Sequence, residues 1–299
     1  MPLDGDWLAA LTRTARDAGA EGEPEVLSDR ADGPVVRVGE VVAKAHAADT
    51  DEAALRSRLR VARDPRLRDV LLPPLPIDGR LLRHHHGRPI TVWQYGIPVD
   101  PDDPDAAPWE QAAALLARLH ATAPSRDTTT MTGLPAAGAP DRVRRAVSRL
   151  RAATHTHPAA AAAVLRASDQ LPELENSPKA LVHGDFHLGQ LVVAPGSGEN
   201  PWRLIDVDDL GMGDPAWDLA RPAAFFATGI LEPVAWERFL MAYRRRRGAA
   251  IPPGVDEWTV LDIPARALVI QHAALAVVKA GPALDDLDTA LIDACLRMP

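Results

Sequence analysis

The hydrophobic pattern of the chain changes its period near residue 100, and this change most restricts the folds it can adopt. Apolar residues have strand character in the segments 25–27, 34–38, 40–46, 80–82 and 89–93. From Trp109 onward they repeat with the period of an α-helix. The stretch 96–108, rich in proline and aspartate, predicts a linker. We therefore expect an α+β chain, with residues 1–96 forming a small strand-rich lobe and residues 97–299 a larger helical lobe.

Apolar spacing also predicts where the helices lie in each lobe. Helices are expected over 7–18 and 49–62 in the first lobe and over 109–120, 142–153 and 158–171 in the second. Two short β signals, Ala180–Val182 and Trp202–Asp206, interrupt the helices of the second lobe. The chain after Trp217 is predicted to be helical, with breaks at prolines.

Charge and composition exclude several classes of protein. The net charge of −8 disfavours a general nucleic-acid binder, which needs a basic surface against phosphates. The acidic N-terminal residues lack the basic start of a signal peptide, and no apolar stretch reaches the roughly 18 residues of a membrane span. The longest apolar stretch, 267–278, is interrupted by Gln271 and His272 and predicts a buried helix. The single cysteine, Cys295, cannot form an internal disulfide, so we expect a cytoplasmic protein, and no partner protein is indicated.

Two segments of the second lobe carry side chains of the kind that phosphoryl transfer requires, namely a carboxylate at the attacking hydroxyl and oxygen ligands for a metal. Asp185 follows a β run and Gly184, so a tight loop is expected to point its carboxylate into a cleft. Gln190 offers an amide oxygen that suits a hard cation. Asp206 and Asp208 alternate at the end of an apolar strand and are expected to project to one side.

Three motifs in this region resemble those of the aminoglycoside phosphotransferase family. They are His-Gly-Asp-x-His-x-Gly-Gln at 183–190, Ile-Asp-x-Asp-Asp at 205–209 and Gly-Asp-Pro-Ala-Trp-Asp-Leu-Ala at 213–220. That family has the two-lobed protein-kinase-like fold. The resemblance implies a small N-terminal antiparallel-sheet lobe that binds the nucleotide. It also implies a larger helical C-terminal lobe with the catalytic loop, the metal site and the acceptor site.

The resemblance also implies roles for single residues. Asp185 would be the catalytic base, and Gln190 and Asp206 would bind Mg2+, with Gln190 standing where the family usually has asparagine. His187 would donate a hydrogen bond to the transferred phosphoryl group, or it would pack inside the loop. Asp218 would accept N–H groups from the catalytic loop. His183 is interpreted as a structural residue that holds the loop through its backbone.

ATP would be bound by residues of the first lobe. Lys44, one of three lysines in the chain, ends an apolar β run, as does the kinase lysine that pairs with the α and β phosphates. Glu52, at the start of the following helix, is the candidate partner of Lys44. Trp93 and Tyr95 end the last strand before the linker, where adenine would bond to the backbone of the hinge.

Two other polar groups have simpler interpretations. Asp209 is interpreted as a turn residue, because aspartate is favoured in turns. The run 84–86 consists of three histidines, which cannot all face one metal from a strand because neighbouring side chains alternate, so a surface turn is expected there.

The sequence therefore predicts a Mg2+- and ATP-dependent phosphotransferase that acts on a hydroxyl group of a small molecule. The acceptor would be an antibiotic such as an aminoglycoside, or a metabolite such as a sugar or an amino alcohol. An alternative is a catalytically weak, pseudokinase-type regulatory protein that binds a nucleotide. A third class, a metal-dependent hydrolase, would need several histidines to converge with the acids, and His183 and His187 alone give it little support.

Overall fold

The computed structural model describes residues 4–30, 33–122, 133–154, 156–174, 177, 179–196, 198 and 201–298. Its contacts divide the chain into two compact units. The first unit combines the N-terminal segment up to Ala107 with the later segment Leu188–Asp208, and the second contains the segment beginning at Pro108, residues from Ala136 to His187 and the chain from Asp209 onward. The assignment of separate functions to residues 1–96 and 97–299 stays a prediction.

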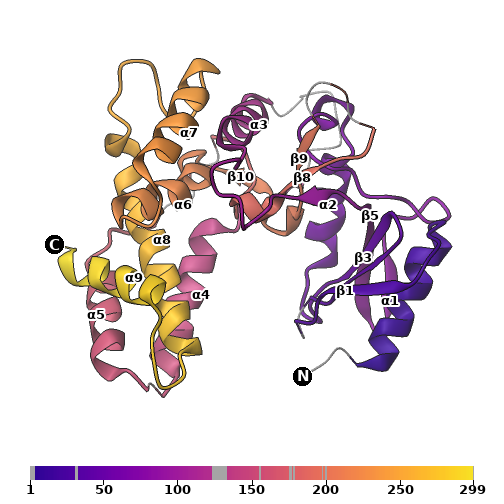
Figure 1. Ribbon diagram of the computed structural model, residues 1–299, viewed down its shortest axis with the longest axis horizontal. Helices are drawn as coiled ribbons and strands as arrows, with labels where there is room; N and C mark the ends of the chain where they lie inside the picture. The colour runs from indigo at the N-terminus through magenta and orange to yellow at the C-terminus, as the bar shows by residue number, and fades with distance from the viewer. Residues whose placement is uncertain are drawn as a thin grey trace. The chain divides into compact units, whose positions relative to one another are not determined.

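The first unit is organised around an antiparallel sheet of five strands in the order β1-β2-β3-β5-β4. Its strands are β1 (Pro24–Ser28), β2 (Val35–Val38), β3 (Val41–Ala45), β4 (Arg83–His85) and β5 (Arg88–Gln94). Burial alternates along β2 and β3, so every second side chain enters the core. The helix α1 (Gly5–Asp17) lies along this sheet (Figure 1), and its residues Leu11 and Ala15 are fully buried against the strands.

Two further elements complete the first unit. The helix α2 (Glu52–Ala62) begins at Asp51, whose side chain accepts hydrogen bonds from the N–H groups of Ala53 and Ala54. A second sheet joins β6 (Ile97–Pro98), β8 (Leu191–Val193) and β9 (Trp202–Leu204) in that order. The stretch 96–108 therefore contributes a short strand as well as a connection.

One strand lies three residues later than the sequence indicated. The prediction of a strand over 80–82 is wrong, because β4 consists of Arg83, His84 and His85. The prediction followed the apolar residues Leu81 and Leu82, but Leu82 is buried just before the strand begins. The strand β4 itself consists of polar residues at the edge of the sheet.

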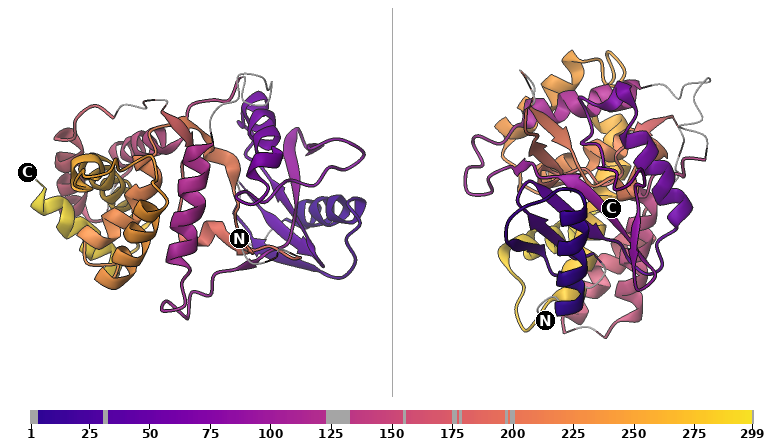
Figure 2. Two further views of the ribbon diagram at one scale, coloured as in Figure 1. Left: turned by 90° about the horizontal axis from the view of Figure 1, so that it is seen from above. Right: turned by 90° about the vertical axis from the view of Figure 1, so that its right-hand side faces the viewer.

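The second unit is mainly helical. Its helices are α3 (Trp109–Ala121), α4 (Ala139–Ala152), α5 (Pro158–Asp169), α6 (Ala216–Ala227), α7 (Pro233–Arg245), α8 (Trp258–Lys279) and α9 (Asp286–Arg297). A two-stranded antiparallel ladder joins β7 (Ala180–Val182) to β10 (Gly211–Gly213). Figures 1 and 2 show α9 beside α8, and α8 also packs against α4, α5 and α6.

The helix α8 forms much of the core of the second unit. By length and composition, α8 is the one helix among the described residues that could cross a membrane. However, 56% of its most apolar stretch is buried inside the protein. The prediction of a buried helix over 267–278 is confirmed, because this stretch lies in α8 and includes the fully buried Ile270 and Ala273.

Candidate functional site

The loop that carries Asp185 is anchored by one buried carboxylate, Asp218 of α6. Its Oδ2 accepts a hydrogen bond from the backbone N–H of His183 at 2.7 Å, and its Oδ1 accepts one from Gly184 N–H at 2.8 Å. His120 Nε2 lies 2.9 Å from the same Oδ2. The hydrogen bonds that the resemblance implied for Asp218 are therefore present, and they fix the backbone immediately before Asp185.

A second layer of polar groups holds His120 in place. The Tyr243 hydroxyl lies 2.7 Å from His120 Nδ1 and accepts a hydrogen bond from Ala250 N–H at 3.0 Å. Because the Asp218 carboxylate can only accept, His120 Nε2–H donates to it, and in that neutral tautomer Nδ1 accepts a hydrogen bond from the Tyr243 hydroxyl. Both His120 and Asp218 side chains are fully buried, so each polar atom in this chain of contacts depends on its partner.

Two glycines make room for Asp209 beside this loop. Gly184 has φ +85°, and a Cβ atom there would collide with the Asp209 carbonyl oxygen. A Cβ atom on Gly138 would collide with the Asp209 carboxylate, and Gly138 N–H donates a hydrogen bond to the Asp209 carbonyl at 3.1 Å. Asp209 is thus enclosed between two glycines whose missing side chains leave room for it.

The carboxylate of Asp185 is held by two arginines of the second unit. Arg221 of α6 donates to its Oδ1 at 2.6 Å, and Arg142 of α4 lies 2.9 Å from its Oδ2. The same Arg142 nitrogen donates to Asp209 at 2.8 Å, so Asp209 is a member of this charge network as well as a turn residue. Burial raises the pKa of Asp185, and the attraction of Arg221 and Arg142 opposes the rise without cancelling it.

These groups line a small pocket. Its walls are formed by Ala139, Arg142, Gly184, Asp185, Phe186, Trp217, Arg221, Leu268 and Gln271, all from the second unit. The pocket therefore offers one carboxylate, two guanidinium groups and apolar walls. In the sequence, Arg221 stands three residues after Asp218 on one helix face, which could have marked it, whereas no sequence signal marks Arg142.

The attraction of Arg221 for Asp185 leads to a pH-dependent prediction. The predicted role of Asp185 as a base requires its ionised form, so under that prediction the rate falls as the pH drops through the pKa of Asp185, which burial places above that of an ordinary aspartate. Arg221→Met removes an attraction that lowers this pKa, so the acid limb of kcat/KM should move to higher pH. Arg221→Lys should restore part of the shift, and Arg238→Met, which breaks the pair with Glu110, should cause none. An unchanged acid limb in Arg221→Met would contradict the coupling.

The first unit brings together a second set of charges around Lys44. Lys44 Nζ lies 2.7 Å from Asp206 Oδ1 and 2.8 Å from Asp208 Oδ2. Burial lowers the pKa of Lys44, but the attraction of Asp208 and Asp206 outweighs burial and raises that pKa above its usual range. Burial likewise raises the pKa of Asp208, and Lys44, helped by His46, outweighs it and lowers that pKa well below its usual range. Lys44 and Asp208 are therefore both charged at neutral pH.

The two aspartates reach Lys44 by a route that differs from the expected strand alternation. β9 ends at Leu204, Asp206 has φ +61°, and Val207–Asp209 forms a 3-10 turn. Aspartate adopts the left-handed region more readily than most residues, and here it turns the chain so that both carboxylates face one cation. The prediction that they project together is confirmed, but the prediction that they do so from a strand is wrong.

Side-chain oxygen atoms in and near Asp206 suit a hard cation. Gln190 lies in a turn after Leu188, and its Nε2 donates to Asp206 Oδ2 at 3.4 Å. Carboxylate and amide oxygens are the ligands that Mg2+ prefers, so the residues fit that ion. A metal bound to Asp206 would require the Gln190 amide to present its oxygen, by rotation about its last side-chain bond. The roles of Gln190 and Asp206 as metal ligands stay predictions.

Glu52 does not pair with Lys44 in the structure. It forms an ion pair with Arg56 one turn later on α2 and lies 2.9 Å from His84 Nε2. Glu52 is the first residue of α2, and its side chain is 40% exposed. Its contact with His84 shows that it faces the hairpin of β4 and β5 and not the aspartates around Lys44. The sequence missed the other close group, His46, whose buried ring lies 3.4 Å from Asp208.

The remaining predicted residues have the following places. Trp93 is largely buried in β5, and its indole N–H donates to Thr91 at 3.0 Å. Tyr95 N–H donates to the Glu40 carbonyl at 2.8 Å, and its ring lies 3.5 Å from the guanidinium carbon of Arg37. Its N–H is therefore already used within the protein, and the hinge stays a prediction. His187 is half-buried in the second unit.

Residues 23–258 match the sequence model described as the phosphotransferase enzyme family. No curated protein sequence matches the chain.

Solved structures match the fold over nearly the whole chain. A spectinomycin phosphotransferase in complex with ADP and spectinomycin is 13% identical, with a TM-score of 0.57, and the match covers 96% of this chain and 93% of that one. A choline/ethanolamine kinase family protein from Mesorhizobium loti is 18% identical, with a TM-score of 0.56 and coverage of 97% and 90%. The macrolide 2'-phosphotransferase MphH from Brachybacterium faecium is 19% identical, with a TM-score of 0.54 and coverage of 97% and 98%. The predicted fold class is confirmed.

Proposed function

Because the chain belongs to the phosphotransferase enzyme family, we propose that it transfers the γ-phosphate of ATP to a hydroxyl group of a small molecule, with Asp185 as the base. The observation that carries this proposal is the placement of Asp185. Its loop is fixed by a buried carboxylate, its own carboxylate lines a pocket, and its pKa is raised by burial. A carboxylate with these properties is suited to orient an acceptor hydroxyl and to take its proton.

The charges of the first unit support the nucleotide side of the proposal. Lys44 would bind the α and β phosphates, and Asp206 and Gln190 would be ligands of Mg2+. The ion would supply positive charge to the phosphate oxygens. Asp206 and Asp208 both form ion pairs with Lys44, so nucleotide binding would exchange these ion pairs for contacts with phosphate and metal. We expect this reaction to take place in the cytoplasm.

The charge of the pocket bears on the class of acceptor. Arg142 and Arg221 already compensate Asp185 and Asp209, so the pocket has no excess of negative charge to attract a polycation. A cationic group next to the reacting hydroxyl would face two guanidinium groups at short range. Among the acceptor classes considered, this favours a neutral or anionic hydroxyl compound, such as a sugar, over an aminoglycoside. It leaves the phosphotransferase activity itself independent of the choice.

ADP release with a panel of hydroxyl compounds tests the activity, and a thermal shift with ATP tests nucleotide binding separately. The panel should pair neutral, anionic and cationic compounds of similar size. Lys44→Met should weaken ATP binding about tenfold or more, because a charged hydrogen bond contributes about 1.5–3 kcal/mol. Lys179→Met is the matched control, because Lys179 pairs with Asp214 on the surface.

The outcomes separate the competing functions. Nucleotide binding with no transfer to any acceptor would favour the pseudokinase-type alternative. Absence of both would overturn the proposal. Efficient transfer to cationic acceptors alone would retain the phosphotransferase and overturn the inference about acceptor charge.

A further inference from the structure

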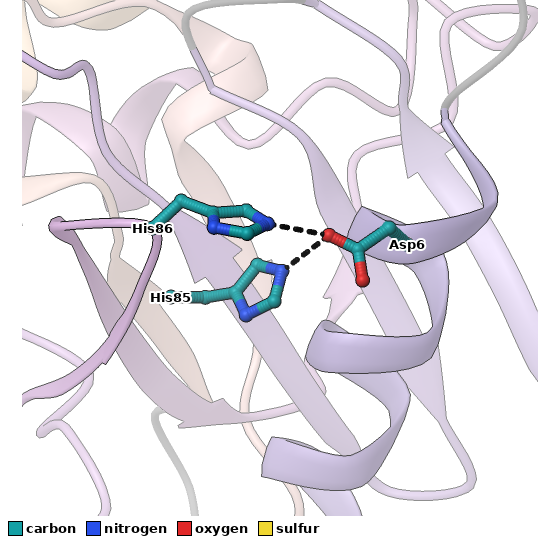
Figure 3. Close-up of side chains that lie close together, drawn as sticks. All are labelled: Asp6, His85 and His86. Atoms are coloured by element: carbon teal, nitrogen blue, oxygen red, sulfur yellow. Dashed lines mark hydrogen bonds and ion pairs between the residues drawn. The ribbon is translucent and has the colours of Figure 1, made fainter.

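Two of the three consecutive histidines converge on one carboxylate far along the chain. His85 Nε2 lies 2.7 Å and His86 Nε2 lies 2.8 Å from Oδ2 of Asp6, in the first turn of α1. Figure 3 shows both rings directed at that single oxygen. One ligand atom from each of the three residues lies within 4.8 Å of the other two. From this arrangement we propose that Asp6, His85 and His86 bind a divalent transition-metal ion, with Zn2+ as the best fit.

The backbone explains why two neighbouring histidines share a face. Alternation along β4 sends His84 and His85 to opposite sides, and His84 accordingly reaches Glu52 instead. His86 has left the strand: it lies in the turn before Gly87, with φ +47°. This left-handed conformation returns its side chain to the side of His85. The prediction of a surface turn over residues 84–86 is therefore correct for His86 only, because His84 and His85 lie in β4. The alternation of side chains along a strand keeps only His84 away from the other two histidines.

The surroundings orient the ligand atoms for binding. The ring of Trp7 meets that of His85 edge to face at 4.9 Å, and the Arg88 guanidinium lies over Trp7 at 4.6 Å, so the His85 ring is packed on one side. Asp4, and not Asp6, caps α1, since it accepts the N–H of Asp6 at 3.2 Å. The carboxylate of Asp6 is therefore not needed to start the helix.

The ligand types select the class of metal. Two imidazole nitrogens and one carboxylate oxygen suit Zn2+, which takes four ligands, with water in the fourth position. Tetrahedral bonds of this kind separate ligand atoms by about 3.3 Å, so the rings must withdraw by roughly half an ångström from Asp6. The His86 side chain is 68% exposed at the end of a hairpin, which permits that movement. The ion would link α1 to the hairpin of β4 and β5 and stabilise the first unit by preferring its folded form.

Metal titration of the full chain tests the proposal without using its enzymatic activity. Zn2+ should be titrated against chelator-treated protein, without nucleotide, because phosphates bind zinc, and with excess Mg2+ to occupy oxygen-only sites. Co2+ should be added in parallel, because its visible absorption reports nitrogen ligands in a four-coordinate site. We expect one Zn2+ per chain and a saturable rise of the thermal midpoint.

Conservative variants decide whether these three residues are the ligands. Asp6→Asn, His85→Gln and His86→Asn should each weaken Zn2+ binding about tenfold or more and abolish the thermal shift. Asparagine tolerates the left-handed backbone at residue 86, so the hairpin should remain intact. His84→Gln is the matched control and should bind Zn2+ as the unaltered protein does. Equal weakening in His84→Gln, full affinity in Asp6→Asn, or no binding at all would each overturn the proposal.

Discussion

Replacing Asp185 by asparagine is expected to lower kcat for phosphate transfer by about 10²- to 10⁴-fold and to leave ATP binding unchanged. Asparagine keeps the shape of the side chain and one acceptor oxygen for Arg221, but it cannot take a proton. Burial raises the pKa of Asp185 even with Arg221 and Arg142 beside it, so a neutral side chain at this position should not destabilise the fold. The variant should therefore unfold at nearly the same temperature as the unaltered protein.

Steady-state kinetics and an ATP titration by thermal shift measure both halves of this expectation. Asp169→Asn provides the control, because it removes an exposed carboxylate of the second unit that pairs only with Arg151 in the described contacts. That variant should keep full kcat. If Asp185→Asn retained more than about a tenth of the activity, proton removal by this residue would no longer account for the reaction.

Replacing Asp218 by alanine is expected to cost about 3–5 kcal/mol of stability in the second unit. The side chain is fully buried, and its removal leaves three donors without an acceptor: the N–H groups of His183 and Gly184, and His120 Nε2–H. Each buried donor left unpaired carries a desolvation penalty. Activity should fall as well, because the backbone before Asp185 loses its anchor.

Chemical denaturation gives the stability of Asp218→Ala, and amide hydrogen exchange at His183 and Gly184 gives the local effect. Asp214→Ala is the matched control. It removes a carboxylate of the same segment that accepts Ala216 N–H at the start of α6, and it should cost about 0.5–2 kcal/mol. Slow exchange at His183 and Gly184 in Asp218→Ala would show that other contacts hold the loop.

The candidate residues of each unit that the sequence indicated are those with local signals. Asp185 after a glycine, Lys44 at the end of an apolar strand and Asp218 on the next helix could all be placed from short motifs, because each depends on neighbours along the chain. Fold class followed from the change of hydrophobic period for the same reason.

The parts that the sequence missed depend on contacts between distant segments. Arg142 reaches Asp185 from a helix that begins more than forty residues earlier, and nothing in its own surroundings distinguishes it from the other arginines of α4. Glu52 was misplaced because a helix start can face several directions, and only the hairpin of β4 and β5 decides among them. Asp206 and Asp208 do project together, but not from a strand as expected, because the left-handed backbone of Asp206 cannot be predicted from an apolar pattern.

The two glycines around Asp209 mean that the pocket beside Asp185 depends on positions without a side chain. Gly138 and Gly184 carry no side chain and no charge, yet a Cβ atom at either position would collide with Asp209. Arg142, which joins Asp209 to Asp185, would then be displaced with it. Substitution by another amino acid should therefore be strongly disfavoured at these two positions, while the exposed Asp141 of α4 can change freely. A search for function that scores only reactive side chains would overlook both of them.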